Sequence, residues 1–397
     1  MSPVSAAVAD SLFAATTTQA YKTDYLSGLA LSRGIDAYLS GSYETSVREF
    51  KRAIGLSLYS ENSYKAHDLL ATTYIQLDKP DEAIATYKAS IRLFQTSDEP
   101  HSKLGTIYFD QGKYDDAEAE YLASYRLNPS SITNLYSLGQ AYIAKGRYDD
   151  ASKMFNKIIQ QSPQNHSGYY GLGQTYYKSG KYEDALEQFD KVLNIKQDFY
   201  SAHVDIGYTY ADMGDLSKAR EQAKILSDVD TDLANLLNTY IYKVSKPEFL
   251  AAYNLDGFNV SSGTGTAVSS LNDSLTTAGA SQSFTMNFIF SKDMDVTSVQ
   301  NPFNWQITKA AAGFPGGAYN WGLPAPSTDV GILPHPKSIY YDASKLTAVI
   351  TFDINQNDTA NGTIDPSHII FAFYGLDAYG NAMSSDGDQY GGFSAIV

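Results

Sequence analysis

Residues 132–165 read ITNLYSLGQAYIAKGRYDDASKMFNKIIQQSPQN, and residues 166–199 read HSGYYGLGQTYYKSGKYEDALEQFDKVLNIKQDF. The two stretches share Leu-Gly-Gln, Gly-x-Tyr, and Ala and Phe at the same offsets. The same 34-residue step separates four further series of residues along the chain: Ala83, Ala117, Ala151, Ala185 and Ala219; Tyr74, Tyr108, Tyr142, Tyr176 and Tyr210; Gly105, Gly139, Gly173 and Gly207; and Gly112, Gly146, Gly180 and Gly214. A fixed period of this length is typical of helix–turn–helix units stacked into a solenoid.

The residue types that recur are suited to close packing of helices. Gly or Ala in the first helix of each unit, and Ala in the second, let the two helices approach each other. Larger side chains fill the space between them, namely the tyrosines of the series together with Tyr87, Tyr121, Phe155 and Phe189. The turn glycine, as in Gly112, suits the left-handed conformation that ends many helices. We therefore expect Tyr108, Tyr142 and Tyr176 to be shielded from water.

The full pattern combines Leu-Gly-x-x-Tyr with Gly-x-Tyr-x-x-Ala and a later aromatic residue, and it resembles a tetratricopeptide repeat (TPR). Clear copies begin near five residues: Tyr64, Asp98, Ile132, His166 and Tyr200. A degenerate sixth copy precedes them, with Gly34 and Phe50 in the matching places. The resemblance implies a right-handed α-solenoid of about six repeats at residues 27–228.

The overall composition narrows the class of function. A length of 397 residues suggests two or three domains. The net charge of −15 and the isoelectric point near 4.7 argue against nucleic acid or anionic lipid as the main partner. The chain has no cysteine, which removes disulfides, thiolate catalysis and cysteine-bound zinc from consideration. No apolar run is long enough to span a bilayer.

The composition changes near residue 250. No Glu occurs after Glu248 and no Arg after Arg220, while Asp, Asn, Ser, Thr and Gly become frequent. Glu and Arg favour helices, whereas the later residue types favour strands and turns. The chain is therefore expected to be a multidomain α + β protein. The expected parts are an N-terminal helical arm or cap (1–26), the repeats (27–228), a capping helix (229–245), a linker (246–280) and a β-sandwich (281–397).

Two interpretations of residues 1–26 remain open. Apolar residues such as Leu12, Phe13, Tyr21 and Tyr25 follow helical spacing. The segment either covers the first repeat or packs on a neighbouring molecule.

The last third of the chain has the pattern of strands. Apolar Phe284, Met286, Phe288 and Phe290 occupy alternate positions, which predicts one buried face. Further strands are expected at residues 305–307, 339–341, 346–354 and 368–374, and several short strands at this spacing favour a β-sandwich.

Three segments of this region resemble a bacterial Ig-like domain of the S-layer-associated type. They are FSKDMD at 290–295, SIYYDASKLTAVITF at 338–352 and GLDAYGNAM at 375–383. The resemblance implies an Ig-like sandwich. The loop at 310–336 is longer than the family has, so its Phe314, Tyr319 and Trp321 either pack on the sandwich or offer a contact surface.

The TPR resemblance also implies a binding surface, because the first helix of each repeat lines the concave groove. The expected groove residues are polar or aromatic: Thr106, Phe109, Tyr136, Gln140, Tyr170, Gln174, Tyr177 and Tyr208. Tyrosine offers a large contact area at low entropic cost, so this set favours protein recognition.

Catalytic and metal-binding motifs are not found. No nucleophile, zinc-protease, Walker or dinucleotide fingerprint is present, and His67, His101 and His203 share one repeat position, which favours a packing role. The Asp and Asn residues at 355–365 and 386–388 offer oxygen ligands for Ca²⁺, but ordinary turns use the same residues and are the favoured interpretation. We therefore expect the protein to have no enzymatic activity and no cofactor.

These patterns predict a protein–protein interaction scaffold outside the cell or on the surface of a bacterium or archaeon, with the periplasm as the alternative. A homo-oligomer or polymer, such as a filament or surface layer, is the preferred assembly. The alternatives are a TPR groove that binds a peptide of another protein, or an adhesin.

Overall fold

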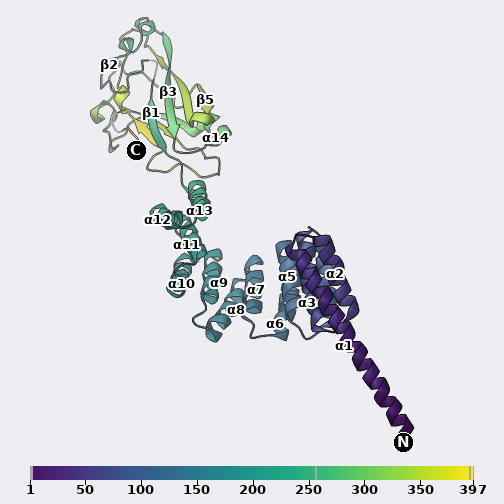
Figure 1. Ribbon diagram of the computed structural model, residues 1–397. Coiled ribbons are helices and arrows are strands. Elements are labelled where there is room, and N and C mark those ends of the chain that lie inside the picture. Colours follow the sequence, from purple (N-terminus) through teal and green to yellow (C-terminus); the bar gives the residue numbers. More distant parts are fainter. Residues whose placement is uncertain (1–2, 255–256, 393–394, 397) are drawn as a thin grey trace. The chain divides into compact units, whose positions relative to one another are not determined.

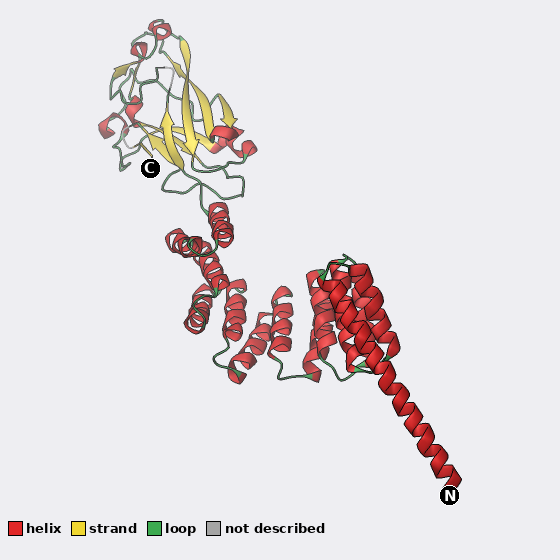
Figure 2. Cartoon of the chain, viewed as in Figure 1, coloured by secondary structure: helices red, strands yellow, loops and turns green. Residues whose placement is uncertain are grey.

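The computed structural model describes residues 3–254, 257–392 and 395–396, and within these ranges the side chains of residues 3–18, 20, 395 and 396 lie outside the description. Within these ranges, thirteen helices are followed by a β-rich region (Figure 1; helices red and strands yellow in Figure 2). The chain divides into two compact units, residues 1–213 and 214–397.

Eleven helices belong to the first unit, and α12 and α13 begin the second. Their bounds are α1 Pro3–Leu39, α2 Tyr43–Leu56, α3 Glu61–Gln76, α4 Pro80–Leu93, α5 Glu99–Asp110, α6 Tyr114–Leu127, α7 Ile132–Ala144, α8 Tyr148–Gln161, α9 His166–Lys178, α10 Tyr182–Ile195, α11 Tyr200–Asp212, α12 Leu216–Ser227 and α13 Thr231–Val244. The predicted helix pairs are confirmed. Of the repeat tyrosines, Tyr142 is buried and Tyr108 and Tyr176 are half-buried, as the packing argument requires.

Glycine in the first helix of a repeat lets an aromatic ring of the second helix lie against the backbone. A Cβ atom at Gly139 would lie 2.5 Å from the ring of Phe155, and one at Gly173 would lie 2.6 Å from the ring of Phe189. The turn glycines have positive φ, +72° at Gly112 for example. The ring contacts explain glycine at the first offset, and the positive φ explains it at the turn, where Asp78 of the first clear repeat also has a positive φ of 54°.

The N-terminal arm is the first part of one long helix, α1. Its C-terminal part packs on α2 and α3, where Ala30 and Leu31 are buried, and its N-terminal part extends beyond those helices (Figure 1). Tyr21 and Tyr25 are 79% and 68% exposed, while the side chains of Leu12 and Phe13 lie outside the described residues. The described part of the helix thus both covers the first repeat and leaves apolar side chains in solvent.

The second unit contains two four-stranded antiparallel sheets, with strand orders β1-β3-β6-β5 and β10-β9-β8-β4, and a short β2-β7 pair. The bounds are β1 Phe249–Tyr253, β2 Thr266–Ala267, β3 Ser281–Phe290, α14 Val296–Gln300, β4 Trp305–Lys309, β5 Ser338–Asp342, β6 Thr347–Asn355, β7 Thr363–Ile364, β8 Ile369–Phe373, β9 Gln389–Gly391 and β10 Ala395–Ile396. The strands expected from the sequence are confirmed as β3, β4, β5, β6 and β8.

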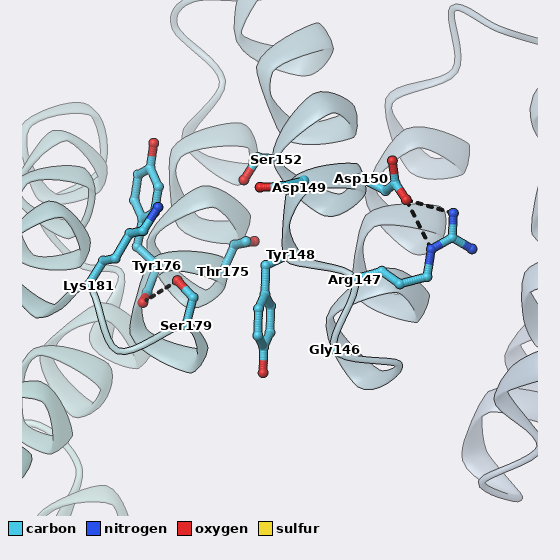
Figure 3. Close-up of a pocket in the computed structure, with 10 residues that line it drawn as sticks. All are labelled: Gly146, Arg147, Tyr148, Asp149, Asp150, Ser152, Thr175, Tyr176, Ser179 and Lys181. Atoms are coloured by element: carbon cyan, nitrogen blue, oxygen red, sulfur yellow. Dashed lines mark hydrogen bonds and ion pairs between the residues drawn. The ribbon is translucent and has the colours of Figure 1, made fainter.

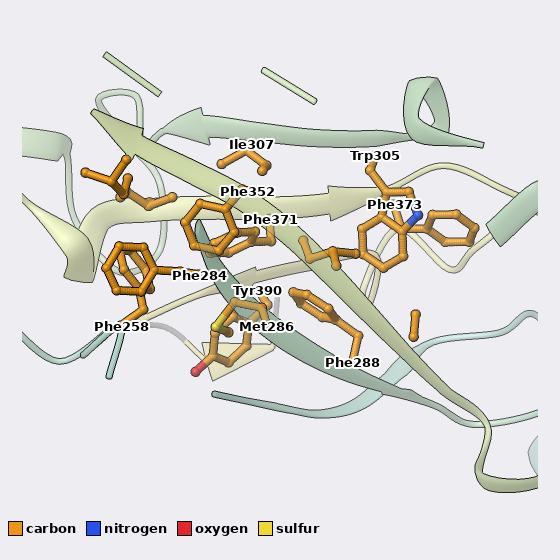
Figure 4. Packing of buried hydrophobic residues seen from close by; sticks show 14 of the residues in the cluster. Phe258, Phe284, Met286, Phe288, Trp305, Ile307, Phe352, Phe371, Phe373 and Tyr390 are labelled. Atoms are coloured by element: carbon orange, nitrogen blue, oxygen red, sulfur yellow. The ribbon is translucent and has the colours of Figure 1, made fainter. Parts of the chain in front are cut away.

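One aromatic core joins the two sheets (Figure 4). Phe288 of β3 has its ring centre 5.2 Å from that of Trp305 of β4 and 5.8 Å from that of Phe371 of β8. The prediction of one buried face on β3 is therefore confirmed, because its apolar positions 284, 286, 288 and 290 are fully buried.

The structure differs from the sequence-based expectation at residues 246–280. Instead of forming a separate linker, this segment contributes β1, which pairs with β3, and buries Phe258, Val268 and Leu275 in the aromatic core. Phe249 and Phe258, two of the apolar residues that the sequence shows in this segment, are buried and hold it in place. In the long loop that follows β4, Tyr319 is buried and Trp321 is 70% exposed.

Candidate functional site

The first helices of the repeats, α3, α5, α7, α9 and α11, present the candidate site. Consecutive first helices lie next to one another, since α5 contacts α7, α7 contacts α9, and α9 contacts α11. We call the side chains that they expose along this row the groove face. It comprises the eight residues predicted above, with Asp68, Lys103 and Asp205 added by the structure.

A chain of hydrogen bonds joins three repeats in the second half of the groove face. The Gln140 side-chain amide donates to Oε1 of Gln174 (2.9 Å), and the Gln174 amide donates to Oδ2 of Asp205 (3.2 Å). The Tyr136 hydroxyl lies beside Gln140, and the Tyr170 hydroxyl lies beside Asp205. Four of the predicted residues are therefore brought together around a carboxylate that the sequence pattern did not identify.

Asp205 is the centre of this network. Its carboxylate is half-buried, and burial raises its pKa although the neighbouring Tyr170 and Gln174 side chains act in the opposite direction. Among the ion pairs of the described residues, none includes Asp205. The site thus contains a carboxylate whose donors are neutral.

The tyrosine rings of the network are held by packing. The Tyr136 ring centre lies 5.5 Å from that of Phe155, and the Tyr170 ring centre lies 4.8 Å from that of Phe199. Burial is also the main reason that the pKa values of both tyrosines are raised, so their hydroxyls remain neutral. Rings fixed in this way present their hydroxyl groups with little loss of conformational entropy on binding.

The other four predicted residues have different surroundings. Phe109 and Tyr177 pack on tyrosines that begin the following helices, Tyr114 at 5.3 Å and Tyr182 at 6.0 Å between ring centres. Tyr208 is half-buried, and its pKa is raised by burial and then by Asp205.

Thr106 lies in the first half of the groove face, where Oγ1 accepts a hydrogen bond from the Tyr121 hydroxyl (3.1 Å). It lines two hollows. One, of about 440 Å³, is formed mainly by α3, α4 and α5, and the other, of about 350 Å³, lies between α5 and α7. Lys103 lines both hollows, and its ammonium pairs with Asp68 (3.0 Å) and Glu99 (3.4 Å).

A third hollow, of about 390 Å³, lies at the turns rather than on the groove face (Figure 3). It is lined by the start of α8 and the end of α9. Its arginine, Arg147, forms ion pairs with Asp150 (2.6 Å) and Glu118 (2.7 Å), so this charge is already neutralised within the chain. We therefore regard the groove face as the better candidate.

Comparison with protein families agrees with this geometry. Residues 69–132 and 102–166 match one tetratricopeptide repeat model, and residues 142–202 match a second. Residues 69–202 are tetratricopeptide repeats. No curated protein matches the chain.

Solved structures resemble the TPR part of the chain. A tetratricopeptide repeat protein from Parabacteroides merdae ATCC 43184 is 17% identical with a TM-score of 0.50, over 55% of this chain and 86% of that one. Pseudomonas aeruginosa pilF is 15% identical with a TM-score of 0.44, over 55% and 99%. A thermophilic TPR protein from Thermus thermophilus is 18% identical with a TM-score of 0.40, over 45% and 98%. At such identities, the similarity to the P. merdae protein indicates a shared fold alone.

Several of the residues considered as metal ligands make other contacts. Asn357 and Asn361 hydrogen-bond each other (2.8 Å), and Asp365 accepts hydrogen bonds from Ser367 (2.7 Å) and Thr264 (2.8 Å). Of the repeat histidines, His67 contacts the Ser63 carbonyl and His101 contacts Glu120. Within the described ranges, no group of three or more His, Asp and Glu side chains could hold a metal ion. Calcium binding by the Asn/Asp loops stays a prediction.

Among the helices of the described residues, none combines the length and the hydropathy that a membrane span requires.

Proposed function

We propose that this chain is a non-catalytic scaffold whose TPR groove face holds an extended segment of another protein. TPR scaffolds mediate protein–protein interaction, and the observation that supports a groove-bound partner here is the continuous Gln140–Gln174–Asp205 network. It spans three repeats and is flanked by the fixed rings of Tyr136 and Tyr170. Amide and phenol groups in such a row can pair with the backbone and polar side chains of an extended peptide.

The proposal is tested with random 12-residue peptides displayed on phage. Peptides selected on the wild-type protein should bind about tenfold more weakly to the double variant Gln140→Ala/Gln174→Ala, because two hydrogen-bonding side chains are lost. The matched control is Gln160→Ala/Gln161→Ala, which removes two exposed glutamines at the end of α8. Equal binding by both double variants, or failure to select any peptide, would contradict a groove-bound partner.

Self-association is a second candidate, because α1 leaves Tyr21 and Tyr25 in solvent. A second copy that covers these rings would remove apolar surface from water. Sedimentation at rising protein concentration, with and without Ca²⁺, should then detect oligomers or filaments that deletion of residues 1–26 abolishes. A species that stays monomeric throughout eliminates this candidate.

We further propose that residues 246–397 form an Ig-like domain and that the protein acts outside the cell or at its surface. The strand orders support the first point. If β1, β3, β4, β5, β6, β8 and β9 correspond to strands A to G, the sheets have the A-B-E-D and C-F-G orders of immunoglobulin domains, with buried Trp305 on strand C. Fractionation of the native cell, with the protein found only in the cytosol, would contradict the location.

A further inference from the structure

Asp205 differs from Asp68, the other carboxylate of the groove face, because its partners are neutral whereas Asp68 pairs with Lys103. Asp205 accepts a hydrogen bond from Gln174 (3.2 Å) and has the Tyr170 hydroxyl beside it, while the Lys178 ammonium, 5.1 Å from the ring centre of Tyr177, acts on it through longer-range electrostatics. A carboxylate has about four acceptor positions. Even when the described residues Gln174 and Tyr170 are each given one of these positions, about two remain for a donor from outside the described part of the chain.

The first half of the groove face contains the same two repeat positions with different residues, so the two halves can be compared. Asp68 of α3 and Lys103 of α5 form an ion pair at 3.0 Å, and Tyr87 also donates to Asp68 (2.9 Å). Three repeats later, the same two positions are occupied by Tyr170 of α9 and Asp205 of α11. One half of the groove face thus supplies its own cation, and the other half has a carboxylate opposite a phenol.

Keeping a half-buried carboxylate charged without a counter-ion costs free energy, because burial removes part of its hydration. A partner that supplies a positive charge offsets this cost. We propose that Asp205 is the docking position for an arginine or lysine side chain of the bound segment. This inference rests on the proposed peptide-binding function.

Two neighbouring features support a cation at this position. The hydroxyls of Tyr170 and Tyr208 lie close enough to Asp205 to be affected by its charge, so an arginine held there also finds phenol oxygens that can accept hydrogen bonds. The net charge of −15 also attracts a basic segment over a longer range. Arginine is preferred to lysine, since its planar guanidinium pairs with a carboxylate through two parallel hydrogen bonds.

The test compares three proteins in the same phage selection: wild type, Asp205→Asn, and the control Asp190→Asn. Asp190 is exposed on α10, so both substitutions change the net charge equally. We expect Arg and Lys to be enriched in peptides selected on wild type and on Asp190→Asn, and to lose that enrichment on Asp205→Asn. Unchanged melting temperature or a higher one establishes that Asp205→Asn is folded.

A selected peptide then tests the guanidinium directly. Replacing its arginine by citrulline, which is neutral and of similar shape, should weaken binding to wild type about 10- to 100-fold, as expected for a lost charged hydrogen bond. On Asp205→Asn the two peptides should bind equally.

Equal binding of the two peptides to wild type overturns the inference, as does Arg enrichment that survives in Asp205→Asn. If the selected peptides still require Gln140 and Gln174, the proposed groove function stands and only the cation position is wrong. If no peptide is selected on any of the proteins, both proposals fail.

Discussion

Gly139 illustrates how one missing methyl group sets the distance between two helices. The Phe155 ring of α8 lies where a Cβ atom of Gly139 would be only 2.5 Å away, and Gly105 faces the Tyr121 ring in the same manner at 2.7 Å. Non-bonded carbon atoms reach optimal separation at about 3.5–4.0 Å. A side chain at either glycine would therefore force the helices or the ring to move.

Gly139→Ala should lower the free energy of unfolding by about 1–3 kcal/mol, because it overpacks this contact. Adding Phe155→Leu should recover part of the loss. The control is Gly55→Ala in α2, where a Cβ atom meets nothing within 4 Å and helix propensity predicts a gain of up to about 1 kcal/mol. Urea denaturation measures all three variants. A Gly139→Ala protein as stable as wild type would refute the packing argument.

Asp205 should make stability depend on pH. Burial raises its folded pKa above the unfolded value of about 3.9, so the folded state disfavours the carboxylate and loses stability as the pH rises from the unfolded pKa to the folded one. Asp205→Asn should therefore be more stable than wild type at pH 7, by up to about 1 kcal/mol, and equal to it below about pH 3.5. Denaturation midpoints at the two pH values decide this, with Asp190→Asn as the unaffected control.

The groove face could be predicted in part because a fixed period places equivalent residues on one side of every first helix. Tyr136, Gln140, Tyr170 and Gln174 follow from that register. Asp205 does not, because the equivalent residues in the preceding two repeats are Ser137 and Gly171, and the 34-residue pattern does not mark this position. Its importance depends on which side chains of the neighbouring repeat reach it, and only the folded structure determines that.

At the scale of elements, strands with strict alternation were predictable and short irregular ones were not. In β3, period-two burial identifies both the strand and its inner face. In β1, the sequence FLAAY has no such alternation, and its pairing with β3 shifts register between Phe249 and Ala251. The formation of β1 therefore depends on its partner strand, whose paired residues lie 34 to 41 positions further along the chain.

The end of helix α13 depends on a side chain from a distant part of the sequence. The Lys292 ammonium donates to the carbonyls of Tyr242 (2.6 Å) and Ser245 (2.8 Å) and forms an ion pair with Asp377 (2.7 Å). The side chains of Lys292 and Asp377 are 2% and 0% exposed. Since the last carbonyls of a helix have no partner within it, this cation both satisfies them and complements the helix dipole.

Lys292→Met should lower the free energy of unfolding of the second unit by about 3–5 kcal/mol, because Asp377 is left buried without its cation. Burial would raise the pKa of Asp377, but Lys292 and Asn381 hold it below its usual range, so the stabilisation is present above about pH 4 and is lost as the pH falls. Thermal denaturation at pH 7 checks the prediction. Lys191→Met, which removes an exposed pair with Glu187, should cost less than about 0.5 kcal/mol.

At the scale of the whole molecule, the composition and the structure place the domain boundary differently. The loss of Glu and Arg suggests a division near residue 246, whereas the compact units divide between Met213 and Gly214. The reason is that α12 packs on α13, and the C-terminal end of α13 is held by Lys292. Helix α12, which belongs to the TPR pattern by sequence, and the predicted capping helix α13 are thus part of the second unit by contact.

This boundary can be tested with two fragments. Residues 214–397 should fold on their own and melt in one cooperative transition, because the fragment retains the α13 carbonyls that Lys292 requires. Residues 246–397 lack those carbonyls, and Asn381 also loses the Lys243 carbonyl to which it donates at 2.7 Å. We expect the free energy of unfolding of the shorter fragment to be lower by at least about 3 kcal/mol. The reason is that Lys292 and Asn381 lose the carbonyl acceptors of α13 next to the buried Lys292–Asp377 ion pair.

Circular dichroism melts of the two fragments give the comparison, and Lys292→Met placed in each provides the control. The substitution should destabilise the longer fragment much more than the shorter one, since only the longer one still has the acceptors of α13. Equal melting temperatures for the two fragments, or an equal effect of Lys292→Met in both, would mean that α13 is dispensable. The domain boundary would then lie where the composition changes.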